Sequence, residues 1–414
     1  MIEVSEAISL VEQAAEPLPP RRIPLLDACG RMLAAPVVSD VDSPPWDRAM
    51  MDGFAVRSSD FSVGGSEMVE LDVAVDLAAG DVTALEIARG ACGRIMTGAP
   101  IPKGADAVVP VECAVDGTSG VHAGGRVRLR DDRFRAGQHI ARRGAAFRAG
   151  QEVLAVGMTL GSAEIGLAAE AGATHATALP RARVAILSTG SELVPPDVVP
   201  HFGQIRNSNG PMIAAAVTLL GAEPIPLGIA ADRPEAIRAA VAQGLAADVL
   251  LLSGGVSAGD LDLVPEILKR CGVVEIFHKV RLKPGKPVWF GRLEREHASP
   301  TLVFGLPGNP ASSLVCFELF VRPAIAILSG RPREAWHLPR RRARLTGSAK
   351  ASPDRAVYLP CRLTLTGNGL EAEPLPWSGS SDLLGLAGAA GLIALPAGGA
   401  RHEPGEEVDI VLRW

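Results

Sequence analysis

Residues 183–193 read RVAILSTGSEL, a continuous apolar run that passes directly into a loop of Ser, Thr, Gly and Glu. Two later stretches have the same form, DVLLLSGGVSAGDLD at 248–262 and TLVFGLPGNP at 301–310. Strands that are apolar on both faces and separated by helices are typical of a parallel sheet covered on both sides. We therefore expect residues 181–330 to form a doubly wound, mostly parallel α/β domain.

Helical patterns occupy the intervals between these strands. We expect helices at 211–220, at 261–270 and from the PGNP loop to about 328, with a further strand at 224–229. Asp232 and Glu235 have the spacing of a capping box, which predicts another helix starting there.

The rest of the chain is expected to form three further domains. Residues 1–46 and 141–180 would make an elongated, partly helical linker domain in two pieces, residues 47–140 an inserted mostly-β domain, and residues 335–414 a small C-terminal β domain. Val4 and Ile8 begin a helical pattern near the N-terminus. Our hypothesis is that this helix packs with the Ala-rich segment 155–178. The predicted fold class is multidomain α/β plus β.

Composition limits the class of protein. The 414 residues are 47% apolar and 21% charged, which suits two to four globular domains. A net charge of −5 without a basic, aromatic-rich stripe argues against nucleic acid. The N-terminus does not have the pattern of a signal sequence, and the uncharged stretch 383–400 has glycines and Pro396 that favour a turn and a buried strand over a membrane span. Six cysteines without a CxxC pair predict reduced thiols in a cytoplasmic protein.

Three loops that follow the apolar strands are candidates for a binding site. Ligands of open α/β sheets bind at the carboxyl ends of the strands, where glycines allow close approach and free N–H and hydroxyl groups bind anions. The candidate residues are Ser188, Thr189 and Gly190; Ser253, Gly254, Gly255 and Ser257; and Pro307, Gly308, Asn309 and Pro310. Three such loops predict a site for an anion or a phosphorylated ligand.

Carboxylates in the same loops would oppose an anion. Two like charges about 4 Å apart repel by about 4 kcal/mol at an effective dielectric constant near 20. A divalent cation between carboxylates and ligand oxygens removes this conflict, and Mg²⁺ prefers such ligands. We therefore predict a Mg²⁺ cofactor with Glu192, Asp260 and Asp262 as candidate ligands. The alternative is that Asp260 or Asp262 only caps the following helix.

Further candidates also have structural explanations. Lys283 and Lys286 surround the Pro-Gly turn of KPGKP and would supply positive charge to an oxyanion, or would lie in a solvated turn. Asp232 could serve only its capping box. Asp52 belongs to an Asp-Gly pair of a kind common in hairpins, and Thr97 precedes a long Pro- and Gly-containing loop.

Taken together, these motifs resemble the MoeA family of molybdenum cofactor biosynthesis, which includes the E domain of gephyrin. The matching segments are PPWDRAMMDGFAV, RIMTGAPIPKGADAVVPVE, GQHIARRG, STGSELV, GQIRNSNGPMI, SGGVSAGDLD, KPGKP and GLPGNPASS, together with SGSSDLLGLAGAAGLIALPAG in the tail. One departure is that Ala145 and Ala146 occupy the positions where the family usually has an acidic pair.

The resemblance implies an enzyme that inserts molybdate into adenylylated molybdopterin and releases AMP. It also implies a homodimer with a cleft between the second domain of one subunit and the third and fourth domains of the other. The resemblance implies four catalytic residues: Asp52, Thr97, Glu192 and Asp262. It places Asp52 and Thr97 on one side of that cleft, opposite Glu192, Asp232 and Asp262. The lysines Lys283 and Lys286 would receive molybdate or the pterin phosphate, Ser253–Gly255 would cradle the ligand, and Pro307 and Pro310 would shape the last loop.

Two other activities fit the same motifs. A molybdopterin adenylyltransferase would make the adenylylated pterin rather than consume it. A non-catalytic scaffold would keep the dimer while losing acids from the cleft. Other cofactor-biosynthesis proteins are possible partners in addition to the substrates. A third possibility is selective handling of tungstate.

Overall fold

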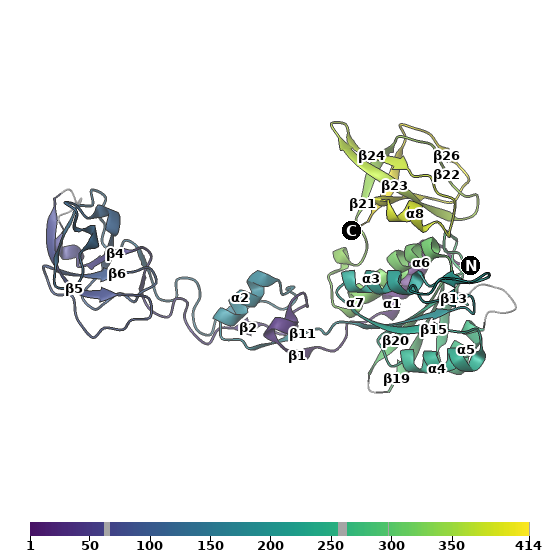
Figure 1. Ribbon diagram of the computed structural model, residues 1–414, viewed down its shortest axis with the longest axis horizontal. Helices are drawn as coiled ribbons and strands as arrows, with labels where there is room; N and C mark the ends of the chain where they lie inside the picture. The colour runs from purple at the N-terminus through teal and green to yellow at the C-terminus, as the bar shows by residue number, and fades with distance from the viewer. Residues whose placement is uncertain (62–66, 256–262, 297, 414) are drawn as a thin grey trace. The chain divides into compact units, whose positions relative to one another are not determined.

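The computed structural model describes residues 1–61, 67–255, 263–296 and 298–413, which fold into two units (Figure 1). Unit 1 comprises residues 1–21, 30–32 and 177–414, and unit 2 comprises residues 22–29 and 33–176. Ser257, Asp260 and Asp262 lie outside the described residues. The division into four domains remains a prediction.

A six-stranded sheet forms the centre of unit 1. Its order is β15 (Glu223–Ala230), β12 (Arg183–Thr189), β16 (Val249–Ser253), β20 (Ala298–Leu306), β19 (Trp289–Arg295) and β17 (Val274–His278). The first four strands pair in parallel, whereas β19 and β17 pair antiparallel. The expected parallel strands are present, and the antiparallel pair at one edge was not anticipated from the sequence.

Helices cover both faces of this sheet, as Figure 1 shows. On one face, Val184 and Ile186 of β12 pack in a core with α1 (Val4–Ala14), α3 (Asn209–Leu219) and the helix Pro310–Leu328. On the other face, Ala185 and Leu187 pack in a second core with α4 (Pro234–Gly244) and α5 (Val264–Arg270). Alternation along a strand sends successive side chains to opposite faces, so a continuous apolar strand feeds two cores.

Two expectations about helices are corrected. The N-terminal helix α1 packs against α7 (Arg322–Leu328) in unit 1, so the hypothesis that it packs with segment 155–178 is wrong. Its buried residues Val4 and Val11 belong to the larger apolar core of unit 1. The capping box is also wrong, because α4 begins at Pro234 and its N-cap is Arg233.

The helix Pro310–Leu328 consists of α6 (Pro310–Cys316), a π-helical turn (Phe317–Val321) and α7. Its length and composition would suffice to cross a membrane, and it is the one such helix among the described residues. However, 94% of its apolar window is buried inside the structure. Its hydrophobicity is therefore explained by its place in the protein core.

The C-terminal part of unit 1 is a closed β-barrel. The strands β23 (Ala356–Thr366), β24 (Gly369–Pro374), β21 (Arg340–Leu345), β27 (Glu407–Leu412) and β25 (Gly391–Leu395) pair in that order, and β25 also pairs with β23. The two-residue strand β18 (Leu282–Lys283) of the preceding α/β region adds to β23. The uncharged stretch 383–400 forms α8 (Leu383–Ala387) and β25, so it contains the expected buried strand.

Short elements complete both units. They are β13 (Leu193–Val194) with β14 (Ile205–Arg206) and β22 (Ala349–Lys350) with β26 (Arg401–His402) in unit 1, β2 (Val37–Val38) with β10 (Glu152–Leu154) and β3 (Arg48–Ala49) with β9 (Ile140–Ala141) in unit 2, and β1 (Arg21–Pro24) and β11 (His175–Ala178).

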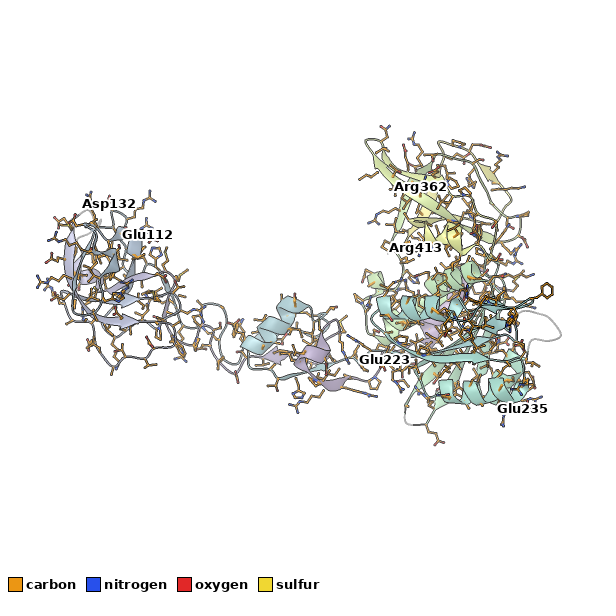
Figure 2. The ribbon with its side chains drawn as sticks, in the orientation of Figure 1. Glu112, Asp132, Glu223, Glu235, Arg362 and Arg413 are labelled. Atoms are coloured by element: carbon orange, nitrogen blue, oxygen red, sulfur yellow. The ribbon has the colours of Figure 1, made fainter. Side chains whose placement is uncertain are left out.

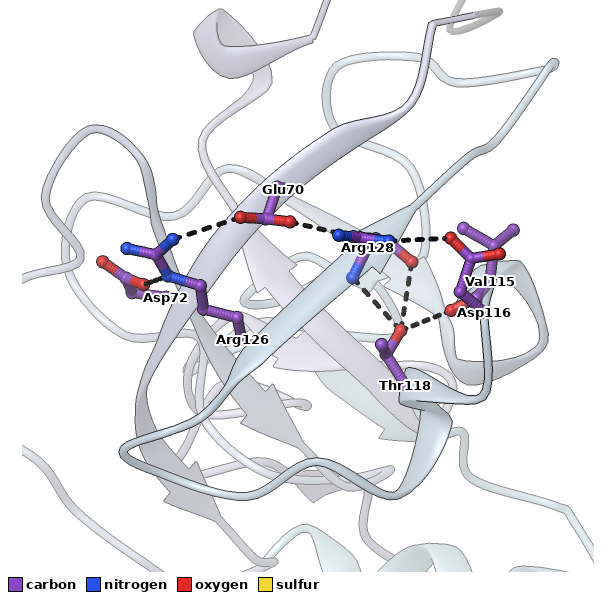
Figure 3. A network of polar contacts seen from close by, with 7 residues as sticks. All are labelled: Glu70, Asp72, Val115, Asp116, Thr118, Arg126 and Arg128. Carbon is purple, nitrogen blue, oxygen red and sulfur yellow. Dashed lines mark hydrogen bonds and ion pairs between the residues drawn. The ribbon is translucent and has the colours of Figure 1, made fainter.

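Unit 2 contains a five-stranded sheet and the helix α2 (Ser162–Glu170). The strand order is β7 (Ala107–Pro110), β4 (Gly53–Val56), β6 (Ala91–Ile95), β5 (Val69–Leu77) and β8 (Arg126–Leu129). Figure 3 shows charged side chains that connect β5 with β8: Arg126 bonds Asp72 and Glu70, and Arg128 bonds Glu70 and Asp116. These pairs are exposed, so we expect each to contribute little to stability.

Candidate functional site

A cavity of about 770 Å³ opens at the carboxyl ends of β12, β16 and β20. The chain runs from β12 outward to β15 and then back to β16, so the strand order reverses between β12 and β16. Such a reversal separates the loops on either side and leaves a crevice for a ligand. All three predicted loops contribute to the lining, through Thr189, Gly190 and Glu192; Ser253, Gly254 and Gly255; and Pro307, Gly308, Asn309 and Pro310.

Two acids contact the first loop: Glu192 belongs to it, and Asp232 follows β15 (Glu223–Ala230). Asp232 lines the cavity and accepts a hydrogen bond from the Ser191 N–H at 2.9 Å, while the Ser191 hydroxyl accepts one from the Asp232 N–H at 3.1 Å. Asp232 therefore braces the loop after β12 rather than capping α4. The carboxylate of Glu192 lies over Gly190, where a β-carbon would be only 2.7 Å from its oxygens. Glu192 is exposed, and its charge is presented at the cavity.

The second loop requires glycine at two adjacent positions. Gly254 has a φ of +97°, and a β-carbon there would lie 2.5 Å from the carbonyl oxygen of Thr189. Gly255 has a φ of +65°, and its β-carbon would lie 2.8 Å from Val264. Both the left-handed backbone and the close packing exclude larger residues. The loop thereby brings its backbone against the first loop at the cavity wall.

Asn209 connects the second loop with the third. Its side-chain nitrogen donates to the Ser253 hydroxyl and to the Gly308 carbonyl, both at 2.7 Å. Since a carbonyl can only accept, this contact fixes which end of the amide carries the nitrogen. The other end, Oδ1, is buried and has no partner among the described residues, as is also true of the Thr189 hydroxyl. Asn209 was not among the predicted site residues, although it lies in the segment GQIRNSNG at 203–210.

Ser188 differs from its neighbours in the predicted set. Its hydroxyl donates to Oδ1 of Asn207 at 3.0 Å, and that oxygen also accepts from the Gly210 N–H. Ser188 is 1% exposed and does not line the 770 Å³ cavity. Ser188 therefore supports the start of α3 through Asn207, and its predicted contact with a ligand stays a prediction.

Lys283 and Lys286 line a second, adjoining cavity of about 390 Å³ rather than the first. We call it the cationic cavity. Arg355 of the barrel is the third cation in its wall, because β18 pairs with β23 in a register that sets Lys283 opposite Val357. Asp354 contacts Arg355 at 3.3 Å, which leaves the cavity with an excess of positive charge. Sequence analysis did not identify Arg355, because only barrel pairing brings it there.

The turn between the two lysines is packed tightly. Gly285 has a φ of +120°, and a β-carbon there would lie 2.5 Å from the sulfur of Cys316 in α6. The backbone of the turn at Pro284 and Gly285 is therefore buried, whereas Lys283 and Lys286 on either side of it are exposed. Trp377 in the wall of the cationic cavity has a buried indole nitrogen for which the described residues supply no acceptor.

The two cavities have common walls. Pro287, Pro307 and Asn309 line both of them. The side chain of Asn309 also donates to the Ser380 hydroxyl at 2.9 Å, which connects the third loop with the barrel. A ligand in the first cavity and an anion in the cationic cavity would therefore be neighbours.

Asp52 and Thr97 come together in unit 2. The Thr97 N–H and hydroxyl each donate to Asp52 Oδ1 at 2.7 Å, and both residues are exposed. These two hydrogen bonds hold the pKa of Asp52 below its usual value, and the one from the Thr97 hydroxyl has the larger effect. The Asp-Gly pair does not form a hairpin between β3 and β4, because β3 pairs with β9 and β4 with β6 and β7.

Ala145 and Ala146 lie in a turn of unit 2. The Ala145 N–H bonds the Arg142 carbonyl, and the Ala146 N–H bonds the Ser43 carbonyl. Nearby, Arg142 and Arg143 pair with Asp47 and Asp42. Backbone hydrogen bonds therefore hold this turn without the acidic pair.

Comparisons with known proteins agree along the chain. Residues 2–172 match the MoeA N-terminal region (domain I and II), residues 185–327 a probable molybdopterin binding domain, and residues 342–412 the MoeA C-terminal region (domain IV). Two relatives are 35% identical to this chain. One is a molybdopterin molybdenumtransferase from a Nostoc species, and the alignment covers 93% of this chain and 87% of the relative. The other is molybdopterin molybdenumtransferase 2 from Mycobacterium tuberculosis, and the alignment covers 96% of each chain.

Solved structures give the same result. Two structures of a molybdopterin biosynthesis MoeA protein from Pyrococcus horikoshii match with TM-scores of 0.78 and 0.73. They are 28% and 27% identical in sequence, and the matches cover 100% of both chains. The fold is thus a multidomain one with α/β sheets and a β-barrel.

We expect Gly254→Ala to destabilise the protein by about 1–3 kcal/mol, because alanine is strained at positive φ and would contact Thr189. Thermal unfolding measures the change. Gly308→Ala is the matched control, since the nearest atom to its β-carbon is 3.8 Å away. Equal melting temperatures of the two variants would contradict the steric argument.

Replacing Thr97 by Val should raise the pKa of Asp52 toward the ordinary value of 3.8, because a hydrogen bond that favours the carboxylate is lost. Carboxyl titration by NMR would measure it. The pKa of Asp42, which depends on Ala149 and Arg143, should not change. An unchanged Asp52 titration would show that the hydroxyl has no such effect.

Proposed function

The chain belongs to the MoeA family, and on this premise we propose that it is a molybdopterin molybdenumtransferase that inserts molybdate into adenylylated molybdopterin and releases AMP. Curated relatives with that name align over nearly the whole chain. The observation that carries the proposal is the pair of adjoining cavities, one lined by glycine-rich loops and one by three cations. The reaction joins two anionic substrates, which need two such sites side by side.

We assign the larger cavity to the adenylylated pterin. Its volume of about 770 Å³ is within the usual range for cavities that bind small ligands. Gly190, Gly254 and Gly255 have no side chain, so a phosphate group could lie close to the backbone at these positions. The third loop leads into the long buried helix that begins at Pro310, and the N-terminus of a helix favours a negatively charged group. Oδ1 of Asn209 and the hydroxyl of Thr189 are buried in this region and have no hydrogen-bond partner among the described residues, so a ligand could satisfy them.

The smaller cavity is assigned to molybdate. Lys283, Lys286 and Arg355 can donate charged hydrogen bonds to the tetrahedral oxyanion, and Ser312 and Ser380 contribute hydroxyls to the same wall. Because Pro307 and Asn309 separate the two cavities, the bound oxyanion would lie next to the pterin dithiolate. Two pterin thiols would displace one molybdate oxygen, which would leave as water with their two protons, and these cations would stabilise the negative charge on the departing oxygen.

We propose that a Mg²⁺ ion binds in the larger cavity, where Glu192 offers an exposed carboxylate. Mg²⁺ usually takes one or two protein carboxylates, completed by phosphate oxygens and water. Glu192 provides one at the cavity, and Asp260 and Asp262 would be the others; in the described part of the chain no three acidic, His or Cys side chains form a metal cluster. When bound, the ion would neutralise charge on the phosphate oxygens during loss of AMP. Asp232 is less suited, because its carboxylate already bonds Ser191.

We further propose that the enzyme is a cytoplasmic homodimer in which Asp52 and Thr97 of one copy complete the cleft of the other. This part of the proposal rests on the family resemblance. Supporting it, Met50, Met51 and Met96 next to the Asp52–Thr97 pair are 58%, 37% and 36% exposed. Exposed apolar side chains grouped beside a polar pair are typical of an interaction surface.

Incubation of the purified protein with adenylylated molybdopterin, molybdate and Mg²⁺ tests the activity, with AMP as the measured product. We expect Glu192→Gln to abolish AMP release without lowering the melting temperature, and EDTA to abolish it reversibly. Full activity of Glu192→Gln or in EDTA would remove the Mg²⁺ assignment. Pyrophosphate release from ATP and molybdopterin would favour the adenylyltransferase, and no turnover of either substrate would favour a scaffold.

The molybdate assignment predicts a separate effect. Lys283→Ala and Lys286→Ala should each raise the KM for molybdate by about tenfold, equivalent to about 1.4 kcal/mol, because one charged hydrogen bond is lost. Affinity for the adenylylated pterin should stay nearly constant. Lys350→Ala removes an exposed lysine elsewhere on the barrel and serves as the control. A molybdate KM that is equal in all four proteins would refute the assignment.

A further inference from the structure

We propose that Asp382 is a positioning residue for the cationic cavity: it fixes the segment Trp377–Ser381, which forms the barrel side of that cavity. The proposal rests on the proposed function, since it assigns a role in binding molybdate. Asp382 does not itself line either cavity among the described residues.

Both oxygens of Asp382 are used. Oδ1 accepts from the Gly385 N–H at 3.0 Å and so caps α8. Oδ2 accepts from the N–H and from the hydroxyl of Ser378, each at 3.0 Å. One carboxylate therefore connects the helix with the start of the segment before it. The hydrogen bond from Gly385 has the largest effect on the pKa of Asp382, and together with those from Ser378 it holds that pKa below its usual value. Asp382 is therefore a carboxylate at physiological pH and can accept all three hydrogen bonds.

The segment Trp377–Ser381, which Asp382 holds, contributes residues to the walls of both cavities. Trp377, Gly379 and Ser380 line the cationic cavity, and Ser381 lines the larger one. Ser380 is fixed twice to the third loop: Asn309 donates to its hydroxyl at 2.9 Å, and the Ala311 N–H donates to its carbonyl at 3.1 Å. A shift of the segment would therefore move hydroxyl donors and the Trp377 ring at the cationic cavity.

The helix that Asp382 caps cannot position the segment by itself. α8 has only five residues, and helices that short are not stable in isolation. At its other end, Arg413 Nη1 donates to the carbonyls of Leu386, Ala387 and Ala389; Figure 2 labels this residue. At its first end, a β-carbon on Gly385 would lie 3.0 Å from the Pro376 carbonyl. The helix is thus an anchored block to which Asp382 ties the segment.

Two substitutions separate capping from positioning. Serine has one side-chain oxygen, so Asp382→Ser can still cap α8 but loses the bonds to Ser378. Asparagine keeps one oxygen for Gly385 but turns its NH₂ toward the Ser378 N–H, where two donors conflict. If Asp382 served only as a helix cap, neither variant would change ligand binding.

The test measures AMP release by the full-length protein at varied molybdate and at varied adenylylated pterin, together with thermal unfolding. We expect Asp382→Ser and Asp382→Asn to raise the KM for molybdate by about tenfold and the KM for the pterin by less than about threefold, because only Ser381 of the segment lines the larger cavity. Ser378→Ala should produce a smaller increase of the same kind, which keeps the test decisive if an Asp382 variant does not fold. Glu373→Gln, which removes an exposed carboxylate of the same barrel, is the control.

The outcomes are distinguishable. If Lys283→Ala raises the molybdate KM but the Asp382 and Ser378 variants do not, the positioning role is wrong and the cavity assignment stands. Equal increases in both KM values would also overturn the positioning role, because they indicate general disruption. If Lys283→Ala itself has no effect, the proposed molybdate cavity fails, and the inference fails with it.

Discussion

The parallel pairing of β12, β16 and β20 is the constraint on which the site depends. Parallel strands end at the same edge, so the loops after them must converge there. Their short side chains and glycines then allow contacts that larger residues would prevent: Gly254 approaches Thr189, and Asn209 bonds both Ser253 and Gly308. The buried apolar helices on both faces hold this edge rigid, and the first cavity is a consequence of their packing.

A second constraint comes from closure of the barrel. Because β25 pairs with β23 as well as β27, β23 has a fixed position, and β18 can add to it. That pairing brings the cations of the α/β region and the barrel into the wall of one small cavity, where Arg355 is paired with Asp354. Negative charge at Glu192 and positive charge at Lys283 thus lie in adjoining cavities. Such a separation suits a reaction between a metal-bound phosphate ligand and an oxyanion.

Several features could be predicted from the sequence because they are local. The strand segments 184–187 and 302–306 have no polar or charged side chain, and their loops have the glycines that close packing needs. The antiparallel strands β17 and β19 were missed, since short mixed runs near a sheet edge resemble loops. The packing of α1 was predicted wrongly because an apolar helical face does not specify which partner covers it. Arg355 gave no signal, being one of many arginines in a β region.

By itself, the sequence determined the alternation of strand and helix, the residue types in the three loops and the family to which the chain belongs. Only the tertiary structure decided that Ser188 donates a hydrogen bond to Asn207 and that Asp232 accepts one from the Ser191 N–H. It also decided that Lys283 and Lys286 line a cavity separate from that of the three loops. The reason is physical. Periodicity and turn chemistry act between residues close in the chain, whereas hydrogen bonds and charge clusters across a site depend on how distant strands pair and how a barrel closes.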